Sequence, residues 1–334
     1  MQWESSLDTS ICLIQATTLA ILGANSNAIV YNSERGGSRM KIRRYLRIIL
    51  ISVVVLILVA VILVTGLMQG WQIKRRTPDQ LASLLTPNFK IKTPPGKGPF
   101  PTILCFHGGA GLINPDGRMW KRAVDWTEYL ADLGYATIFV DSFTARSIPS
   151  THNLLKTFMS GYMKQQPGDV LVAISEARKL SFVDKEQLAL SGASAGALAI
   201  MDTFAMNPPQ EIPANLINAP DNPLAGVKAA ILFYPYCDTP AKAKGKGWTQ
   251  NIPVLMLMGG KDPYTKSCLE IVTILENKRR PIRAHVYPFA QHAFDGTPED
   301  EKYFPSLPPP HNPEATADAR RRVKEFLAEV FHKI

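Results

Sequence analysis

The stretch that decides the fold is residues 188–200, which read LALSGASAGALAI. Apolar residues lead into a cluster of small ones and then continue as apolar residues. Two interpretations are open. The small residues could form a seam for close packing, or Ser194 could be a nucleophile held on a sharp turn between a strand and a helix. The sequence on both sides of the stretch helps to decide between them.

Short apolar runs alternate with helical patterns from residue 87 onward. This alternation predicts an α/β fold, in which helices cover both faces of a mainly parallel sheet. The predicted strands are 102–106, 136–140, 187–190, 229–234, 254–258 and 284–287, and the predicted helices are 121–133, 168–180, 195–206, 266–278 and 314–331. A G-x-S-x-G pattern thus falls between a strand and a helix, which favours a nucleophile elbow at Ser194.

A serine nucleophile needs a histidine as its base and an acid that orients this histidine. After an elbow serine, the acid comes first along the chain and the histidine follows. The chain has six histidines, and His292 lies directly after the last predicted strand, where a loop can bring it over the serine. We therefore predict His292 as the base. Asp262 follows the preceding strand and is the predicted acid, with Asp238 as the alternative.

Negative charge on the substrate oxygen needs amide donors. The backbone N–H of Ala195 is one predicted donor. The glycine-rich turn after the first long strand, residues 107–111, supplies the other, and both Gly108 and Gly109 are candidates. The chain has no dinucleotide-binding or P-loop pattern and no His/Cys cluster with metal-ligand spacing, so neither a cofactor nor a metal is expected.

These motifs resemble those of the α/β-hydrolase superfamily and, within it, the dienelactone hydrolase family. The resemblance covers about residues 87–334 and is carried by CFHGGAG, VDSFTARS, SGASAGA, LFYPYC, GGKDPYTKSC and YPFAQHAFD. It implies an α/β-hydrolase fold, the triad Ser194, Asp262 and His292, and a small ester or lactone as substrate. It also makes Arg146 a candidate substrate-binding residue, because members often carry an arginine shortly after DSF.

The nucleophile departs from the prototype of the family, which uses a cysteine. A serine in its place favours general carboxylic esters, cleaved through an acyl-enzyme intermediate. An acyltransferase or a peptidase acting on cell-envelope material would use the same fold. A third possibility is a binding module without catalytic activity.

Two of the four cysteines form a candidate pair. Cys237 ends one predicted strand and Cys268 begins the helix after the next, and exported relatives look similar in this pairing. The resemblance therefore implies a Cys237–Cys268 disulfide, which agrees with an exported domain. The alternative is two free thiols beside the rim of the site.

Residues 48–68, IILISVVVLILVAVILVTGLM, contain no charge. A helix of about 20 apolar residues crosses a bilayer, so this segment predicts a membrane anchor that contacts the lipid bilayer. A cleaved signal peptide is the alternative, although its apolar part is normally about 7–15 residues. Six basic residues precede the segment and three follow it, which favours a cytoplasmic N-terminus and an extracytoplasmic domain, as in a bacterial inner-membrane protein.

The net charge of +9 equals the number of Lys and Arg residues between positions 35 and 76, a segment without acids. The basic excess therefore flanks the anchor and predicts no nucleic-acid partner. The expected organisation is an extension over 1–39, disordered or a misassigned start, an anchor segment over 40–76, and a catalytic domain over 77–334. The oligomeric state does not follow from the sequence.

Overall fold

The computed structural model describes residues 37–68, 73–148, 161–238, 241–303 and 311–331. The extension predicted over 1–39 lies outside the described residues except for its last three. Contacts divide the chain into two units, Met1–Leu63 and Val64–Ile334, and each is described by itself. The boundary placed at residue 77 stays a prediction.

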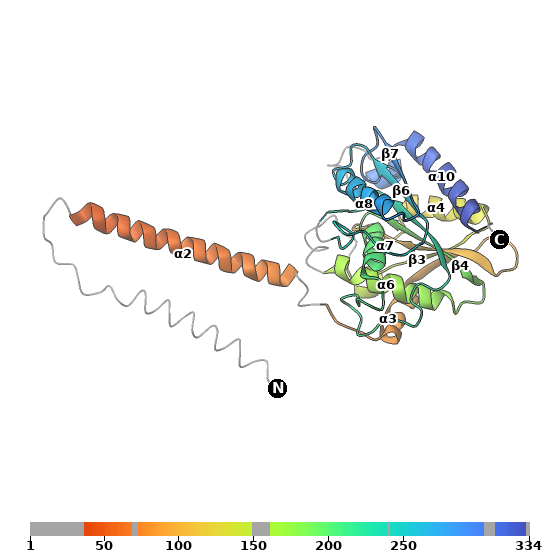
Figure 1. Ribbon diagram of the computed structural model, residues 1–334, viewed down its shortest axis with the longest axis horizontal. Helices are drawn as coiled ribbons and strands as arrows, with labels where there is room; N and C mark the ends of the chain where they lie inside the picture. Colours follow the sequence, from red (N-terminus) through yellow and green to blue (C-terminus); the bar gives the residue numbers. More distant parts are fainter. Residues whose placement is uncertain (1–36, 69–72, 149–160, 239–240, 304–310, 332–334) are drawn as a thin grey trace. The chain divides into compact units, whose positions relative to one another are not determined.

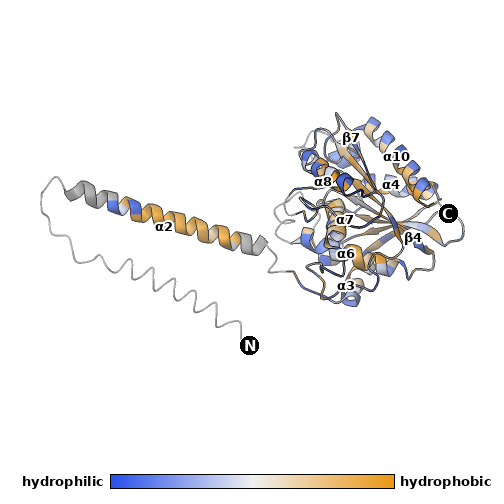
Figure 2. Ribbon diagram, viewed as in Figure 1, coloured by the Kyte–Doolittle hydropathy of each residue, from blue (hydrophilic) through white to orange (hydrophobic). Residues whose placement is uncertain are grey.

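The first unit contributes most of helix α2, Gly37–Met68, which includes the predicted segment 48–68. The part Arg44–Ile62 has a mean hydropathy of 3.0, and none of it is buried. Figure 2 shows that apolar residues surround this helix rather than forming one stripe. By length and composition, α2 is able to cross a membrane.

The second unit is built on a seven-stranded sheet with the order β1-β3-β2-β4-β5-β6-β7 (Figure 1). Strand β1 pairs with β3 in antiparallel orientation, and all other pairs are parallel. The strands are β1 (Phe89–Lys92), β2 (Phe100–Phe106), β3 (Ala136–Val140), β4 (Val183–Ala193), β5 (Val227–Phe233), β6 (Val254–Gly259) and β7 (Ile282–Tyr287). The prediction of a mainly parallel α/β sheet is confirmed.

Helices cover both faces of this sheet. Side chains of α3, α6, α7 and α8 form one apolar core with the sheet, and those of α4 and α10 form the other. Along β2, Leu104 faces the first core while Ile103 and Cys105 face the second, because successive side chains of a strand point to opposite faces. The helices are α3 (Pro78–Leu85), α4 (Lys121–Asp132), α6 (Tyr162–Ala177), α7 (Ala195–Met206), α8 (Thr265–Asn277), α9 (Pro298–Glu301) and α10 (Pro313–Phe331), with short 3₁₀ turns η1 (Thr86–Asn88) and η2 (Thr144–Arg146).

Helix α6 begins six residues before the predicted start and contains Pro167. Proline lacks the N–H that an interior helical residue donates, so it is unusual within a helix. Tyr162 and Gln166 on the added segment are buried and donate hydrogen bonds to the carbonyl of His107. These tertiary contacts favour the helical conformation on both sides of the proline.

The chain before α3 pairs with the long loop between α7 and β5. The N–H of Arg76 donates to the carbonyl of Asn215 at 2.9 Å, and the N–H of Ile217 donates to the carbonyl of Arg76 at 2.8 Å. The Nε of Arg75 also donates to the carbonyl of Leu216 at 3.0 Å. Backbone pairing therefore extends to residues before the predicted start of the domain.

Candidate active site

Ser194 is the single residue between β4, which ends at Ala193, and α7, which begins at Ala195. Its backbone has φ +53° and ψ −112°, a conformation that a residue with a Cβ rarely adopts. The strain turns the chain sharply from strand to helix, as expected for a nucleophile elbow. The serine hydroxyl therefore lies at the N-terminal end of α7, where the helix dipole is positive.

The two glycines of the motif allow this turn to pack closely. A Cβ on Gly196 would lie 2.1 Å from the carbonyl oxygen of Phe106 in β2, and a Cβ on Gly192 would lie 2.5 Å from the carbonyl carbon of Gly196. Both distances are far below van der Waals contact. The small residues thus serve both the close packing and the sharp turn. That Ser194 is a nucleophile stays a prediction.

The predicted triad residues meet at one end of the sheet. The Nε2 of His292 lies 2.9 Å from the Oγ of Ser194, and its Nδ1 lies 2.7 Å from an oxygen of Asp262. The other oxygen of Asp262 accepts a hydrogen bond from the N–H of Tyr264 at 3.0 Å. The Asp262 side chain is 1% exposed and that of His292 is 31% exposed. A buried carboxylate thus orients an imidazole that is partly exposed to solvent and lies next to Ser194.

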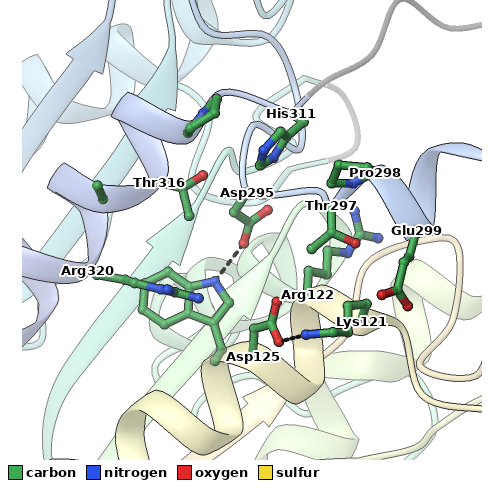
Figure 3. A pocket seen from close by; sticks show the side chains of 13 residues that line it. Lys121, Arg122, Asp125, Asp295, Thr297, Pro298, Glu299, His311, Thr316 and Arg320 are labelled. Atoms are coloured by element: carbon green, nitrogen blue, oxygen red, sulfur yellow. Dashed lines mark hydrogen bonds and ion pairs between the residues drawn. The ribbon is translucent and has the colours of Figure 1, made fainter.

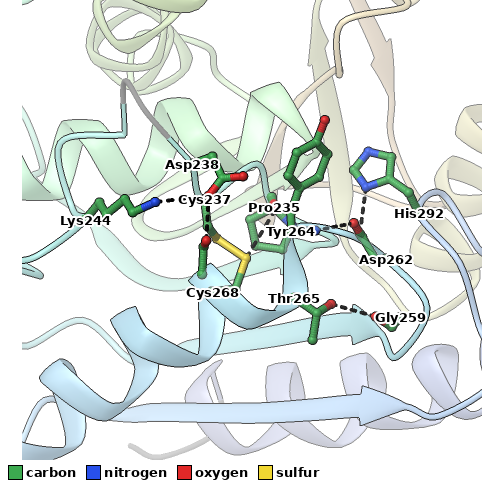
Figure 4. Close-up of a disulfide and its surroundings, with 11 residues drawn as sticks. Pro235, Cys237, Asp238, Lys244, Gly259, Asp262, Tyr264, Thr265, Cys268 and His292 are labelled. Atoms are coloured by element: carbon green, nitrogen blue, oxygen red, sulfur yellow. Dashed lines mark hydrogen bonds and ion pairs between the residues drawn. A yellow bond between two sulfur atoms is a disulfide. The ribbon is translucent and has the colours of Figure 1, made fainter.

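The alternative acid, Asp238, lies elsewhere. Its carboxylate accepts a hydrogen bond from the hydroxyl of Ser267 and forms an ion pair with Lys244 at 3.1 Å. Figure 4 draws Asp238 on the far side of Tyr264 from the Asp262–His292 pair. The geometry therefore favours Asp262 as the residue that orients His292.

Two segments that were predicted to supply amide donors lie next to Ser194. Ala195 is the first residue of α7, and the first N–H groups of a helix have no partner within the helix. Gly108 is adjacent, since a Cβ built on it would lie 3.2 Å from the Cβ of Ser194. The turn after β2 thus lies next to Ser194. An oxyanion hole formed by Ala195 with Gly108 or Gly109 stays a prediction.

Two residues that the sequence analysis did not single out hold this turn. The hydroxyl of Tyr162 lies 3.0 Å from the carbonyl oxygen of His107, and the side-chain amide of Gln166 donates to the same oxygen at 2.9 Å. The ring of His107 stacks on that of Tyr162 with centroids 5.5 Å apart. Burial lowers the pKa of His107, so this histidine is neutral and acts in packing. Because both partners come from a segment of α6 that was not predicted to be helical, sequence periodicity could not find them.

Comparison with known proteins agrees with this geometry. Residues 215–331, which contain Asp262 and His292, match the model of the dienelactone hydrolase family. Over these residues the chain resembles dienelactone hydrolases, the family that its motifs indicate. Members of this family are hydrolases with the α/β-hydrolase fold, and the domain described here has that fold. A search of curated proteins found no match.

Solved structures share the fold of this domain. A putative dienelactone hydrolase from Klebsiella pneumoniae matches with a TM-score of 0.52 and 18% identity, over 72% of this chain and 99% of that one. A dienelactone hydrolase-like promiscuous phosphotriesterase from metagenomic libraries matches with a TM-score of 0.53 and 15% identity, over 72% of this chain and 98% of that one. Esterase 2 of Thermogutta terrifontis matches with a TM-score of 0.50 and 19% identity, over 72% of this chain and 89% of that one. At these identities the likeness shows the fold.

Arg146, which the family resemblance suggested as a substrate-binding residue, lies beside Asp169. Its guanidinium donates two hydrogen bonds to the Asp169 carboxylate, at 2.6 and 2.9 Å, and others to the carbonyl of Ser142 and the side chain of Gln165. The Arg146 side chain is 8% exposed and that of Asp169 is fully buried. Substrate binding by Arg146 stays a prediction, and these contacts favour a role in holding the turn after β3.

Cys237 and Cys268 form a disulfide in the structure (Figure 4). The bond links the segment after β5 to the first turn of α8, beside the chain that carries Asp262. The third cysteine that the structure describes, Cys105, is a buried free thiol within β2. Among the described residues, no group of three or more His, Cys, Asp or Glu side chains is arranged to hold a metal ion.

Proposed function

We propose that this domain is a serine hydrolase that cleaves carboxylic esters through an acyl-enzyme intermediate. The observation that carries the proposal is the pair of hydrogen bonds that links the Oγ of Ser194, both ring nitrogens of His292 and the carboxylate of Asp262. These bonds join a nucleophile, a base and an orienting acid in the order that the chemistry requires. The match of residues 215–331 to the dienelactone hydrolase family supports hydrolysis as the class of reaction.

In the first half of the reaction, the Oγ of Ser194 forms a bond to the carbonyl carbon of the ester. The hydroxyl proton passes to the Nε2 of His292, and Asp262 stabilises the imidazolium that results. The carbonyl oxygen becomes an oxyanion, which accepts hydrogen bonds from the N–H of Ala195 and from an N–H of Gly108 or Gly109. The ester C–O bond then breaks, and His292 returns its proton to the departing alcohol.

In the second half, water takes the place of the alcohol. His292 removes a proton from a water molecule, whose oxygen bonds to the acyl carbon. The bond between this carbon and the Oγ of Ser194 breaks, and the serine recovers its proton from His292. The products are one carboxylic acid and one alcohol, and the enzyme needs no external oxidant or reductant.

We further propose that α2 anchors the domain in a membrane, with the domain on the extracytoplasmic side. The length and composition of Arg44–Ile62 support the anchor, and the excess of basic residues before the segment supports the orientation. The Cys237–Cys268 disulfide is consistent with an oxidising compartment. The test is trypsin added to intact spheroplasts, which digests the domain in this orientation and leaves it intact in the opposite one.

The catalytic proposal is tested with the full chain purified in detergent, by hydrolysis of p-nitrophenyl butyrate. We expect Ser194→Ala to lower kcat/KM by at least roughly a thousandfold, because residual catalysis comes only from binding and the oxyanion donors. Ser267→Ala is the matched control, because it removes a serine hydroxyl near the site but outside the triad, and it should change kcat/KM less than threefold. Equal activity of wild type and Ser194→Ala would contradict the proposal.

A further inference from the structure

We propose that Tyr234 and Asp295 are positioning residues for His292, which hold the loop of the base against the end of the sheet. This inference rests on the proposed serine hydrolase function and adds two residues to the triad. Among the described residues, neither side chain forms a hydrogen bond with Ser194. Their effect is on the geometry of the imidazole that does.

The loop that carries His292 needs external contacts, because it lies outside regular secondary structure. It follows β7, which ends at Tyr287, and its next residue, Ala293, has a φ of +60°. Residues with a Cβ adopt this left-handed conformation only when their surroundings enforce it. The hydrogen bonds of His292 to Ser194 and Asp262 depend on this shape, so the contacts that hold the loop also govern the triad.

Asp295 supplies such contacts three residues after the base. Its carboxylate is buried and accepts a hydrogen bond from the hydroxyl of Tyr234 at 2.7 Å and from the indole N–H of Trp126 at 2.9 Å. Tyr234 directly follows β5 and Trp126 belongs to α4. One carboxylate therefore ties the loop to both the sheet and a covering helix. Figure 3 draws Asp295 at the wall of a cavity of about 450 Å³, with its bond to the indole nitrogen dashed.

Tyr234 connects this carboxylate to the base itself. Its ring meets the ring of His292 edge-on with centroids 5.0 Å apart, and it packs against Phe294 at 5.5 Å. Among the described residues, the other aromatic contact of His292 is Tyr264, which belongs to the turn of the acid. Tyr234 is thus the aromatic contact that fixes His292 independently of Asp262.

The position of the Tyr234 ring is itself well determined. Its backbone has a φ of +34°, and its N–H donates to the carbonyl of Leu257 in the neighbouring strand β6 at 2.7 Å. Burial and the nearby Asp295 carboxylate raise the pKa of Tyr234, so its hydroxyl keeps the proton that it donates. A fixed backbone at one end and a charged acceptor at the other leave the ring little freedom beside the imidazole.

Substitution of these residues in the full chain tests the inference, with p-nitrophenyl butyrate as substrate. We expect Tyr234→Phe, which keeps the ring, to lower kcat roughly tenfold, and Asp295→Ala to lower it roughly a hundredfold. The reason is that misplacement of a catalytic group by about 1 Å lowers the rate by up to about a hundredfold. KM should stay within twofold of wild type in both variants. Asp295→Asn keeps an oxygen acceptor for the tyrosine hydroxyl and should recover part of the loss.

Tyr287→Phe is the matched control. Tyr287 also packs against Phe294, at 5.0 Å, and its hydroxyl donates to Asp318 at 3.2 Å, but among the described residues its ring contacts are with Phe294 and His285 rather than His292. This variant should keep kcat within twofold of wild type. It therefore separates the positioning of His292 from the general effect of losing a tyrosine hydroxyl beside Phe294.

The inference is overturned if Tyr234→Phe and Asp295→Ala both keep kcat within twofold, if Tyr287→Phe loses as much kcat as Tyr234→Phe, or if KM rises at unchanged kcat. Should Asp295→Ala not fold, Tyr234→Phe against Tyr287→Phe decides alone. Ser194→Ala in the same assay distinguishes a failure of the proposed triad from a failure of the positioning role. An active Ser194→Ala refutes the triad, whereas an inactive one with unaffected Tyr234 and Asp295 variants refutes only the positioning role.

Discussion

The Nε2 of His292 lies 2.9 Å from the Oγ of Ser194, although 98 positions separate the two residues in the chain. The sheet accounts for this proximity. Ser194 directly follows β4 and His292 follows β7, and the strands from β4 to β7 run parallel in their order along the chain. Parallel strands end at the same edge of a sheet, so the segments that follow them meet there.

The choice of acid can be tested by comparing two asparagine substitutions. Asp262→Asn should lower kcat by roughly 10³–10⁴, because an amide cannot stabilise the imidazolium or hold the required tautomer of His292. Asp238→Asn should stay within threefold of wild type, because Asp238 is bonded to Ser267 and Lys244. The measurement is kcat for p-nitrophenyl butyrate, and an equal loss in both variants would contradict the assignment of Asp262.

The glycine after the nucleophile should not tolerate a methyl group. Gly196→Ala places a Cβ 2.1 Å from the carbonyl oxygen of Phe106, and overpacking of this kind destabilises a fold by about 1–3 kcal/mol or more. We expect the midpoint of thermal unfolding to fall further than in Gly134→Ala. Gly134 has a φ of +88° and no atom near the added Cβ, so that control carries backbone strain alone. A smaller effect at position 196 than at 134 would contradict the packing described for the elbow.

Asp202 makes stability depend on pH. Burial raises the pKa of this carboxyl to about 7, partly offset by the hydrogen bond from the N–H of Lys242, whereas an unfolded aspartate has a pKa of about 4. Between these values the unfolded chain releases a proton that the folded chain keeps, so this group's contribution to stability falls as pH rises from about 4 to about 7.

Asp202→Asn removes this dependence and keeps an oxygen acceptor for the N–H of Lys242. The variant should therefore be more stable than wild type at pH 8, by up to roughly 4 kcal/mol, and the gain should be clearly smaller at pH 5. Denaturant unfolding at the two pH values measures it. A gain that is equal at both pH values, or a loss at pH 8, would argue against a buried carboxyl with a raised pKa.

The segment before α3 should stabilise the domain. A chain that begins at residue 77 keeps the Thr77 cap of α3. It lacks the two backbone hydrogen bonds of Arg76 and the side-chain bond of Arg75 that a chain beginning at residue 73 retains. At about 1 kcal/mol each, their loss should lower the midpoint of thermal unfolding by roughly 5–10 °C. Equal midpoints would show that this pairing contributes nothing.

Much of the fold could be predicted because its core strands are continuously apolar. The strand 136–140 and the helix 195–206 were predicted with the bounds that the structure has. The exposed strand β1 could not be predicted, since its sequence FKIK is short and mostly solvent-facing. The early start of α6 was hidden by Pro167, because the contacts of Tyr162 and Gln166 that favour the helix are tertiary.

The candidate site likewise has one part that could be predicted from the sequence and another that could not. Ser194, Asp262 and His292 follow apolar strands, so a sequence pattern can locate them. The contacts around them cannot be located in this manner. Tyr234 and Asp295 lie in the motifs LFYPYC and YPFAQHAFD, but these motifs do not show that the two side chains meet each other or that Trp126 joins them. Arg146 illustrates the limit of resemblance, since the motif places it after β3 but does not specify Asp169 as its partner.

The most direct test of the central claim is to locate the nucleophile chemically. The full chain is incubated with a fluorophosphonate probe, and the modified residue is identified by peptide mass spectrometry. The account predicts one adduct, on Ser194, which disappears in Ser194→Ala and forms far more slowly in His292→Ala. An adduct on another residue, or labelling of Ser194→Ala at the rate of wild type, would contradict it.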